Sequence, residues 1–114
     1  MRLDDAVGRL SALAHPSRLA VFRLLVQSGP EGLAAGAIAE RLEIAPPTLS
    51  FHLAQLASAG LVASRRDGRS ILYSADFTAA GELVAYLYEN CCAGGCEPAV
   101  HLPPVRRADR RTEP

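Results

Sequence analysis

The sequence predicts a mainly α-helical domain that carries one small β-hairpin. Apolar residues recur every three or four positions along most of residues 3–90, which is the spacing of amphipathic helices. Asp67-Gly68 separates two strand-like runs, and this dipeptide between extended segments is a strong hairpin signal. At 114 residues, of which 49% are apolar, the chain fits one globular domain.

A proline marks the boundary between the first two predicted helices. The first covers residues 3–14, and its apolar face comprises Leu3, Ala6, Val7, Leu10, Leu13 and Ala14. The run His15-Pro16-Ser17-Arg18 interrupts it, and a proline fits the first turn of a second helix because its missing N–H is not needed there. The second helix is apolar on nearly every side and stops at residues 28–32, so we expect it at the buried centre of the domain.

Two shorter helices follow, joined by a turn at residues 43–45. The third helix places Ile38, Ala39 and Leu42 on one face, and the fourth, Pro46 to Ala59, turns Leu49, Leu53 and Leu56 inward. The prolines at its start are tolerated because the first helical positions need no N–H. Two short helices with such a turn form a helix-turn-helix candidate.

The hairpin and a last helix complete the domain. A two-residue type I′ turn at Asp67-Gly68 predicts the pairs Arg66–Arg69, Ser64–Ile71 and Val62–Tyr73. The last helix begins near Asp76 or Thr78, either of which can cap it, and continues to Asn90. This order is that of a winged helix-turn-helix domain covering residues 1–96, followed by a Pro/Arg-rich mobile tail over 97–114.

Polar side chains on the fourth helix and arginines on the hairpin are typical of DNA binding. In a winged helix, the second helix of the pair enters the major groove and the hairpin reaches the flanking backbone. The candidate DNA contacts are Thr48, Ser50, Phe51, His52 and Gln55 on the helix, with Arg65, Arg66 and Arg69 on the hairpin. The alternative is a solvated helix face on which His52 is a half-buried structural histidine.

Charge excludes a uniformly basic nucleic-acid coat. The chain has 12 basic and 12 acidic residues and no lysine, so a DNA site depends on local clustering of arginines. The acidic start Asp4-Asp5 is unlike a signal peptide, and no run approaches the ~18 apolar residues of a membrane span. We therefore expect a cytoplasmic protein with reduced thiols, no membrane contact and no enzymatic activity.

Local sequence resembles the ArsR/SmtB family of bacterial metalloregulators over about residues 5–90. The run Thr48–Leu56 with Ala59-Gly60-Leu61-Val62 looks like that family's recognition helix and wing entry, and residues 15–18 look like its first helix junction. The resemblance implies a homodimeric repressor that leaves operator DNA when an inducer binds. One departure is that Ala45-Pro46 replaces the usual polar cap, so the first amides are either uncapped or turned towards phosphate.

A homodimer also follows from the apolar surface of the first and last helices. Both helices carry broad apolar faces, and so small a core cannot bury all of this apolar surface. A C2 dimer would cover the two faces and set two recognition helices one DNA turn apart. The alternative is that the two faces pack against each other within one subunit.

The three cysteines predict a site for a soft ion. Cys91 and Cys92 are adjacent at a helix end, and Cys96 follows two glycines that let the chain double back. Adjacent cysteines form a poor disulfide, whereas three thiolates suit arsenic(III) or antimony(III), whose lone pair replaces a fourth ligand. Zinc would need a fourth donor such as His101. The arrangement is similar to that of arsenic sensors with a vicinal pair and a third cysteine near the last helix.

We therefore expect an arsenic(III)-responsive repressor with no permanent cofactor, whose inducer is arsenite, antimonite or methylarsenite. The remaining alternatives are a zinc-, cadmium- or lead-responsive repressor, a thiol-redox-sensing repressor and a pure interaction module. A small thiol reductase is disfavoured because the sequence has no Cys-x-x-Cys and no phosphate-cradling loop. A histidine beside the acids of the last helix, as in zinc sensors, is also missing. The cysteines can also be free thiols near a frayed end.

Overall fold

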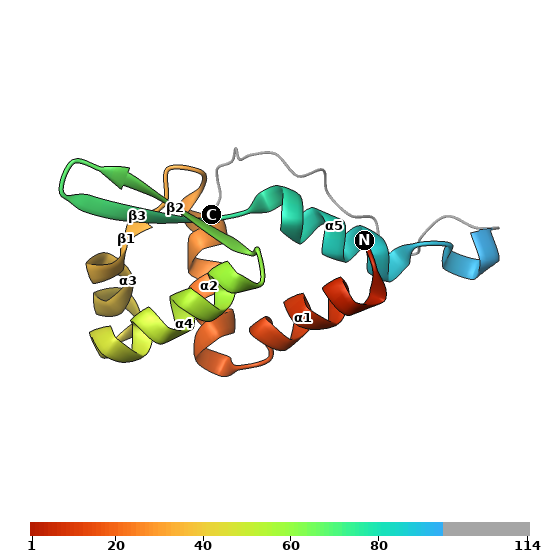
Figure 1. The fold of residues 1–114 in the computed structure, drawn as a ribbon, viewed down its shortest axis with the longest axis horizontal. Helices are drawn as coiled ribbons and strands as arrows, with labels where there is room; N and C mark the ends of the chain where they lie inside the picture. Colours follow the sequence, from red (N-terminus) through yellow and green to blue (C-terminus); the bar gives the residue numbers. More distant parts are fainter. Residues whose placement is uncertain (95–114) are drawn as a thin grey trace.

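The computed structural model describes residues 1–94 and shows a winged helix-turn-helix fold (Figure 1). The elements are α1 (Leu3–Leu13), α2 (Pro16–Ser28), β1 (Leu33–Ala34), α3 (Ala35–Leu42), α4 (Pro46–Ser58), β2 (Val62–Asp67), β3 (Ser70–Ala75), α5 (Phe77–Tyr88) and a 3-10 turn, η1 (Cys91–Gly94). The predicted mainly α fold with its hairpin is confirmed. The predicted tail, 97–114, and Cys96 lie outside the described residues.

The hairpin belongs to a three-stranded antiparallel sheet in the order β1-β3-β2. The sequence analysis missed β1, because two residues are too few to show an alternating pattern. Its pairing brings the chain so close to β3 that a Cβ at Gly32 would collide with the carbonyl oxygen of Tyr73. Gly32 also has a φ of +80°, so only glycine fits this position without strain.

The predicted register of the hairpin was wrong by two residues. Asp67 pairs with Ser70 and Val62 pairs with Ala75, so the turn residues are Gly68-Arg69 rather than Asp67-Gly68. Gly68 has a φ of +64°, and Arg69 does not share this positive φ. A glycine with positive φ at the first turn position is the pattern of a type II′ turn. Because the shift is an even number of residues, every side chain keeps its predicted face.

The core lies where α2 meets α4 and the sheet. Leu25, Ile38 and Leu56 are fully buried, and they come from α2, α3 and α4 respectively. The expectation that α2 is buried on nearly every side was wrong, since Leu19 and Val26 are 43% and 39% exposed. The helix buries one face against its neighbours and leaves the other at the surface.

α1 and α5 lie side by side on one flank of the core (Figure 1). Arg9 joins them, since its Nη1 donates to the carbonyl oxygen of Ala79 at 2.9 Å and lies 3.3 Å from Glu82 Oε1. Asp76, one of the two predicted caps, accepts a hydrogen bond from the Ala79 N–H at 2.9 Å and so starts α5. The helix ends at Tyr88, two residues before the predicted end, and Asn90 then adopts a positive φ.

Both helices of this flank keep apolar side chains at the surface. Those that are at least 38% exposed are Leu3, Val7 and Leu10 on α1 and Val84 and Leu87 on α5. Their positions on α1 repeat at intervals of four and three residues, which is one helix face. Within residues 1–94, no helix has the length and apolarity needed to cross a membrane.

Candidate nucleic-acid interface

Helix α4 presents an exposed face that carries most of the predicted DNA contacts. Its buried side chains Leu49, Leu53 and Leu56 fix the helix on the core, so the opposite face of the helix points outward. Thr48, Ser50, Phe51 and Gln55 are all exposed, and 57% of the Phe51 side chain is accessible. No residue of this helix other than its buried histidine can carry a charge.

His52 is not part of that face. It is only 5% exposed, and its ring centroid lies 4.7 Å from that of His15. Its Nδ1 is buried without a hydrogen-bond partner among residues 1–94. Burial lowers the pKa of His52 below its ordinary value, and the charges of His15 and Arg18 lower it further. The residue therefore belongs to the packing of α4, as the structural alternative expected, and its contact with DNA stays a prediction.

The junction at residues 15–18 holds α1, α2 and α4 together. The His15 Nδ1 accepts a hydrogen bond from the Ser17 N–H at 3.1 Å and caps α2, while its ring packs on His52. The Arg18 Nε donates to the carbonyl oxygen of Ala12 at 2.7 Å, near the end of α1. Sequence reasoning missed this role for His15, although its place directly before Pro16 marks a helix start.

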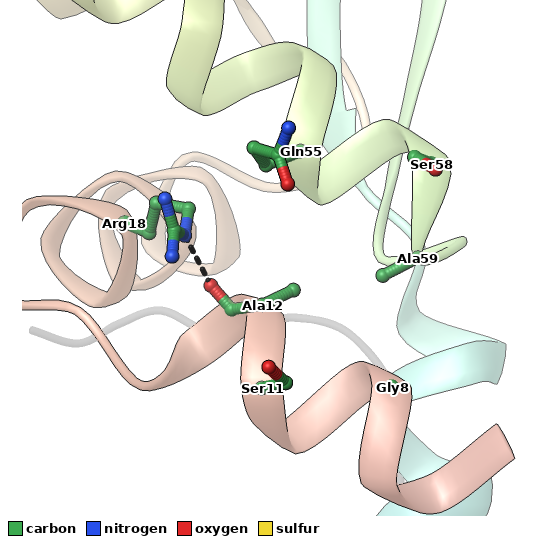
Figure 2. A pocket seen from close by; sticks show the side chains of 7 residues that line it. All are labelled: Gly8, Ser11, Ala12, Arg18, Gln55, Ser58 and Ala59. Carbon is green, nitrogen blue, oxygen red and sulfur yellow. Dashed lines mark hydrogen bonds between the residues drawn. The ribbon is translucent and has the colours of Figure 1, made fainter. Parts of the chain in front are cut away.

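Gln55 lies at the edge of the exposed face, beside a small pocket between α1 and α4. Figure 2 shows the Arg18 guanidinium next to Gln55, with its hydrogen bond to Ala12. The pocket has a volume of about 280 Å³ and is lined by Gly8, Ser11, Ala12, Arg18, Gln55, Ser58 and Ala59. Gln55 therefore borders both the outward face of α4 and the contact between α4 and α1.

The start of α4 needs no side-chain cap. Ala45 is the N-cap residue and provides none, and Pro46 and Pro47 occupy the first two helical positions. Since proline has no N–H, two of the donors that would need a partner do not exist. Because the Leu49 N–H donates to the Ala45 carbonyl oxygen at 2.9 Å, the alternative that amides of the first turn point towards phosphate is limited to Thr48.

The hairpin carries three exposed arginines. Arg65 donates from Nη2 to the carbonyl oxygen of Glu31 at 2.9 Å, which ties the wing to the loop before β1. Arg66 and Arg69 form no hydrogen bond with any of residues 1–94. The one ion pair within residues 1–94 joins Arg9 to Glu82, so none of the wing arginines is paired with a carboxylate there. Their charge is available to an external anion such as a phosphate.

The cysteine pair follows α5 directly. The Cys91 thiol donates to the Cys92 sulfur at 3.6 Å, and the Cys92 sulfur itself belongs to a disulfide bond. Cys91 is partly buried and Cys92 is exposed. Asn90, Cys92 and Ala93 have positive φ, so the backbone leaves the right-handed helical conformation before it reaches Gly94. In Figure 1 the turn η1 and the hairpin lie at opposite ends of the molecule.

The third predicted sulfur ligand, Cys96, and the possible fourth zinc ligand, His101, lie outside the described residues. Over residues 1–94, no group of three His, Cys, Asp or Glu side chains comes together as a metal site. The convergence of three sulfurs therefore stays a prediction.

Comparison with known proteins identifies the domain. Residues 13–65 match the model of a helix-turn-helix domain family. The nodulation protein NolR of Rhizobium meliloti is 38% identical over 84 residues, which are 74% of this chain and just under two thirds (66%) of NolR. The HTH-type transcriptional regulator YgaV of Escherichia coli is 34% identical over 89 residues, which are 78% of this chain and 88% of YgaV.

Solved structures agree with this assignment. An ArsR-like transcriptional regulator from Rhodococcus superposes with a TM-score of 0.68 at 26% identity, over 80% of this chain and 82% of that one. A winged helix-turn-helix DNA-binding domain from Mycobacterium bovis, described as homodimeric, gives a TM-score of 0.62 at 29% identity, over 84% and 89%.

The names of further relatives differ in what they regulate. They include a biofilm growth-associated repressor of Agrobacterium fabrum, the transcriptional activator HlyU of Vibrio cholerae and a putative arsenical resistance operon repressor of Halobacterium salinarum. One solved structure is of HlyU in its reduced form. What these proteins share is transcriptional regulation through this fold. The chain belongs to the ArsR-type family of winged helix-turn-helix transcriptional regulators.

Proposed function

We propose that the protein is a homodimeric transcriptional repressor that leaves its operator DNA when trivalent arsenic binds Cys91, Cys92 and Cys96. The choice of inducer rests on the contact between the Cys91 and Cys92 sulfurs directly after α5, which is one of the two helices of the proposed dimer face. The inducer is arsenite, antimonite or methylarsenite, and the protein acts in the cytoplasm.

DNA binding is supported by the complementary chemistry of α4 and the wing. The outward face of α4 offers hydroxyl, amide and apolar groups to base edges, and the wing offers unneutralised guanidinium groups to phosphates. Arg66 and Arg69 form no side-chain hydrogen bond or ion pair within residues 1–94 that DNA would have to break. Arginine forms bidentate contacts with phosphate, which fix the register of the protein on the duplex.

Dimerisation is supported by the apolar face that α1 and α5 leave at the surface. Leu3 is 66%, Val7 54% and Leu87 55% exposed, which is costly in water and favourable once a second copy covers them. The homodimeric description of the Mycobacterium bovis relative supports the same arrangement here. A C2 dimer presents two α4 helices to one face of a palindromic operator.

Trivalent arsenic is supported by the geometry of the cysteine pair. The sulfurs of Cys91 and Cys92 lie 3.6 Å apart, close enough to share one thiophilic ion once the disulfide bond of Cys92 is reduced. The pair needs only one more sulfur to complete a three-coordinate site, and Cys96 follows four residues after Cys92. The similarity to an arsenical resistance operon repressor, 36% identical over 83 residues, adds support.

The free energy that the inducer must supply for release is moderate. To move operator occupancy from 99:1 to 1:99, the inducer must favour the unbound state by about 5.5 kcal/mol. A dimer with one site on each subunit divides this into roughly 3 kcal/mol per site, which is an ordinary coupling free energy. Cys91 and Cys92 lie at the opposite end of the molecule from the wing, so α5 and the dimer contact must transmit the change.

A thiol-redox-sensing repressor is the second candidate, favoured by the disulfide bond of Cys92 and by similarity to a regulator whose reduced form was solved. Zinc, cadmium or lead as inducer is the third, and zinc requires a donor beyond the three cysteines.

Fluorescence anisotropy of the reduced protein on DNA from upstream of its own gene separates these candidates. We expect arsenite, methylarsenite or antimonite to release the DNA, and Cys91→Ser, Cys92→Ser and Cys96→Ser variants to stay bound. His101→Ala is the control and should respond like the wild type. Release by zinc or cadmium that is lost in His101→Ala would contradict the arsenic site. Release by a disulfide-forming oxidant, with no response to arsenicals, would establish the redox candidate instead.

A further inference from the structure

The outward face of helix α4 carries no charged side chain. Between Pro46 and Ser58 the helix contains no Asp, Glu, Arg or Lys, and its single histidine is buried. Phe51 and Ala54, three positions apart, are both exposed and lie on the same side of the helix. A helix with this face has few groups that can form charged bidentate contacts with guanine, the commonest specific contact to DNA.

Phe51 is the one large apolar side chain of this helix that is exposed. Its exposed fraction, 57%, is similar to that of the apolar residues on α1 and α5. A second copy that packs on α1 and α5 accounts for those residues, whereas Phe51 lies on a different helix. The ring stands beside the buried His52, with 6.0 Å between the ring centroids. An aromatic ring held outward on an exposed helix face is available for contact with a partner.

Charge indicates what that partner is. The hairpin beside the helix-turn-helix carries Arg65, Arg66 and Arg69, none of them in an ion pair within residues 1–94. A polyanion is attracted to these groups, and a duplex that meets the wing brings its major groove to α4. Phe51 would then lie against base edges.

Thymine is the one base whose major-groove edge carries an apolar group, its C5-methyl. A phenyl ring cannot donate or accept an ordinary hydrogen bond, so the thymine methyl is the major-groove group that it contacts most favourably. We propose that Phe51 reads a thymine methyl in each operator half-site, with Ala54 packing beside it. This inference rests on the proposed function, since it names the base that the DNA-binding helix recognises.

Uracil substitution in the operator tests the proposal directly. Uracil pairs as thymine does and lacks only the methyl group. We expect uracil at one or two positions per half-site to weaken binding about fourfold for each buried methyl group, and about fifteenfold when both half-sites are changed. The Phe51→Ala variant should bind the thymine operator more weakly and lose its sensitivity to uracil at those positions. Leu19→Ala, an exposed apolar residue on α2, should keep that sensitivity.

Two results would overturn the inference. One is an affinity that does not change with uracil at any position, and the other is a Phe51→Ala variant that remains as sensitive to uracil as the wild type. In either case the protein still binds its operator, so the proposed function stands. Failure of the wild type to bind any duplex would instead overturn the proposed function, and the thymine contact with it. Circular dichroism of Phe51→Ala should match the wild type, because the side chain is exposed.

Discussion

Replacing Val7 by aspartate should separate the proposed dimer into monomers. Val7 lies on α1 between Leu3 and Leu10, and 54% of its side chain is exposed in the single chain. In a C2 dimer each copy of α1 meets the partner through the same face, so one substitution changes the interface twice. Val26→Asp on α2 makes the same chemical change at a residue that is 39% exposed and outside that face. It serves as the matched control.

The exposed fraction of Val7 sets the size of the effect. Covering the half of a valine that is still exposed contributes about 1 kcal/mol, so two copies contribute about 2 kcal/mol. Val7→Ala removes most of this and should weaken the dimer roughly tenfold. Aspartate also places a carboxylate in an apolar contact, which costs several kcal/mol for an unpaired charge. Val7→Asp should therefore weaken the dimer by about a thousandfold or more.

Sedimentation equilibrium at micromolar concentration measures this directly. The wild type and Val26→Asp should sediment as a dimer, twice the 12.1 kDa of the chain, and Val7→Asp as the 12.1 kDa monomer with an unchanged circular dichroism spectrum. The monomer should also lose operator affinity, because one half-site supplies only half of the contacts. A Val7→Asp variant that remains dimeric, or a wild type that is monomeric, would refute the assignment of the dimer face to α1.

Three further substitutions test the packing of α4, the start of α5 and the wing. The pKa of His52 is lowered in the folded state, so the unfolded chain binds the proton more readily and the free energy of unfolding should fall as the pH drops below about 6.5. His52→Leu should flatten this pH dependence in urea unfolding from pH 8 to 5. An unchanged slope would argue against a role of His52 in the pH dependence. Asp76→Ala removes the cap on Ala79 and should cost about 1 kcal/mol in urea unfolding, whereas Thr78→Ala should cost much less; equal losses would contradict the cap. Arg66→Gln should weaken operator and unrelated DNA alike and reduce the salt slope by about one, and an effect confined to the operator would show that Arg66 reads bases.

Much of the fold could be predicted because the helices carry strong local signals. Apolar spacing and Pro16 located the start of α2, and the Asp67-Gly68 dipeptide located the hairpin. The two-residue error in register arose because turn types I′ and II′ both accept glycine, and the sequence does not say which turn position Gly68 takes. β1 was missed because it is stabilised by pairing with β3 rather than by a pattern of its own.

The candidate site was less accessible to sequence reasoning. Thr48, Ser50 and Phe51 are exposed as expected, since a helix with regularly spaced leucines on one face must turn the opposite face outward. His52 sits next to them in sequence but lies 100° further around the helix, and its contact with His15 depends on how α1 and α2 pack against α4. The Arg65 hydrogen bond to Glu31 joins residues 34 positions apart, so no local pattern reveals it.

The most direct test of the account is the ratio of two affinities at physiological salt, one for DNA from upstream of the protein's own gene and one for unrelated DNA of equal length. A repressor that reads bases through α4 should bind its operator at least about a thousandfold more tightly. Equal affinity for both duplexes would show that only the wing arginines contact DNA, and would contradict the assignment of α4 as a recognition helix.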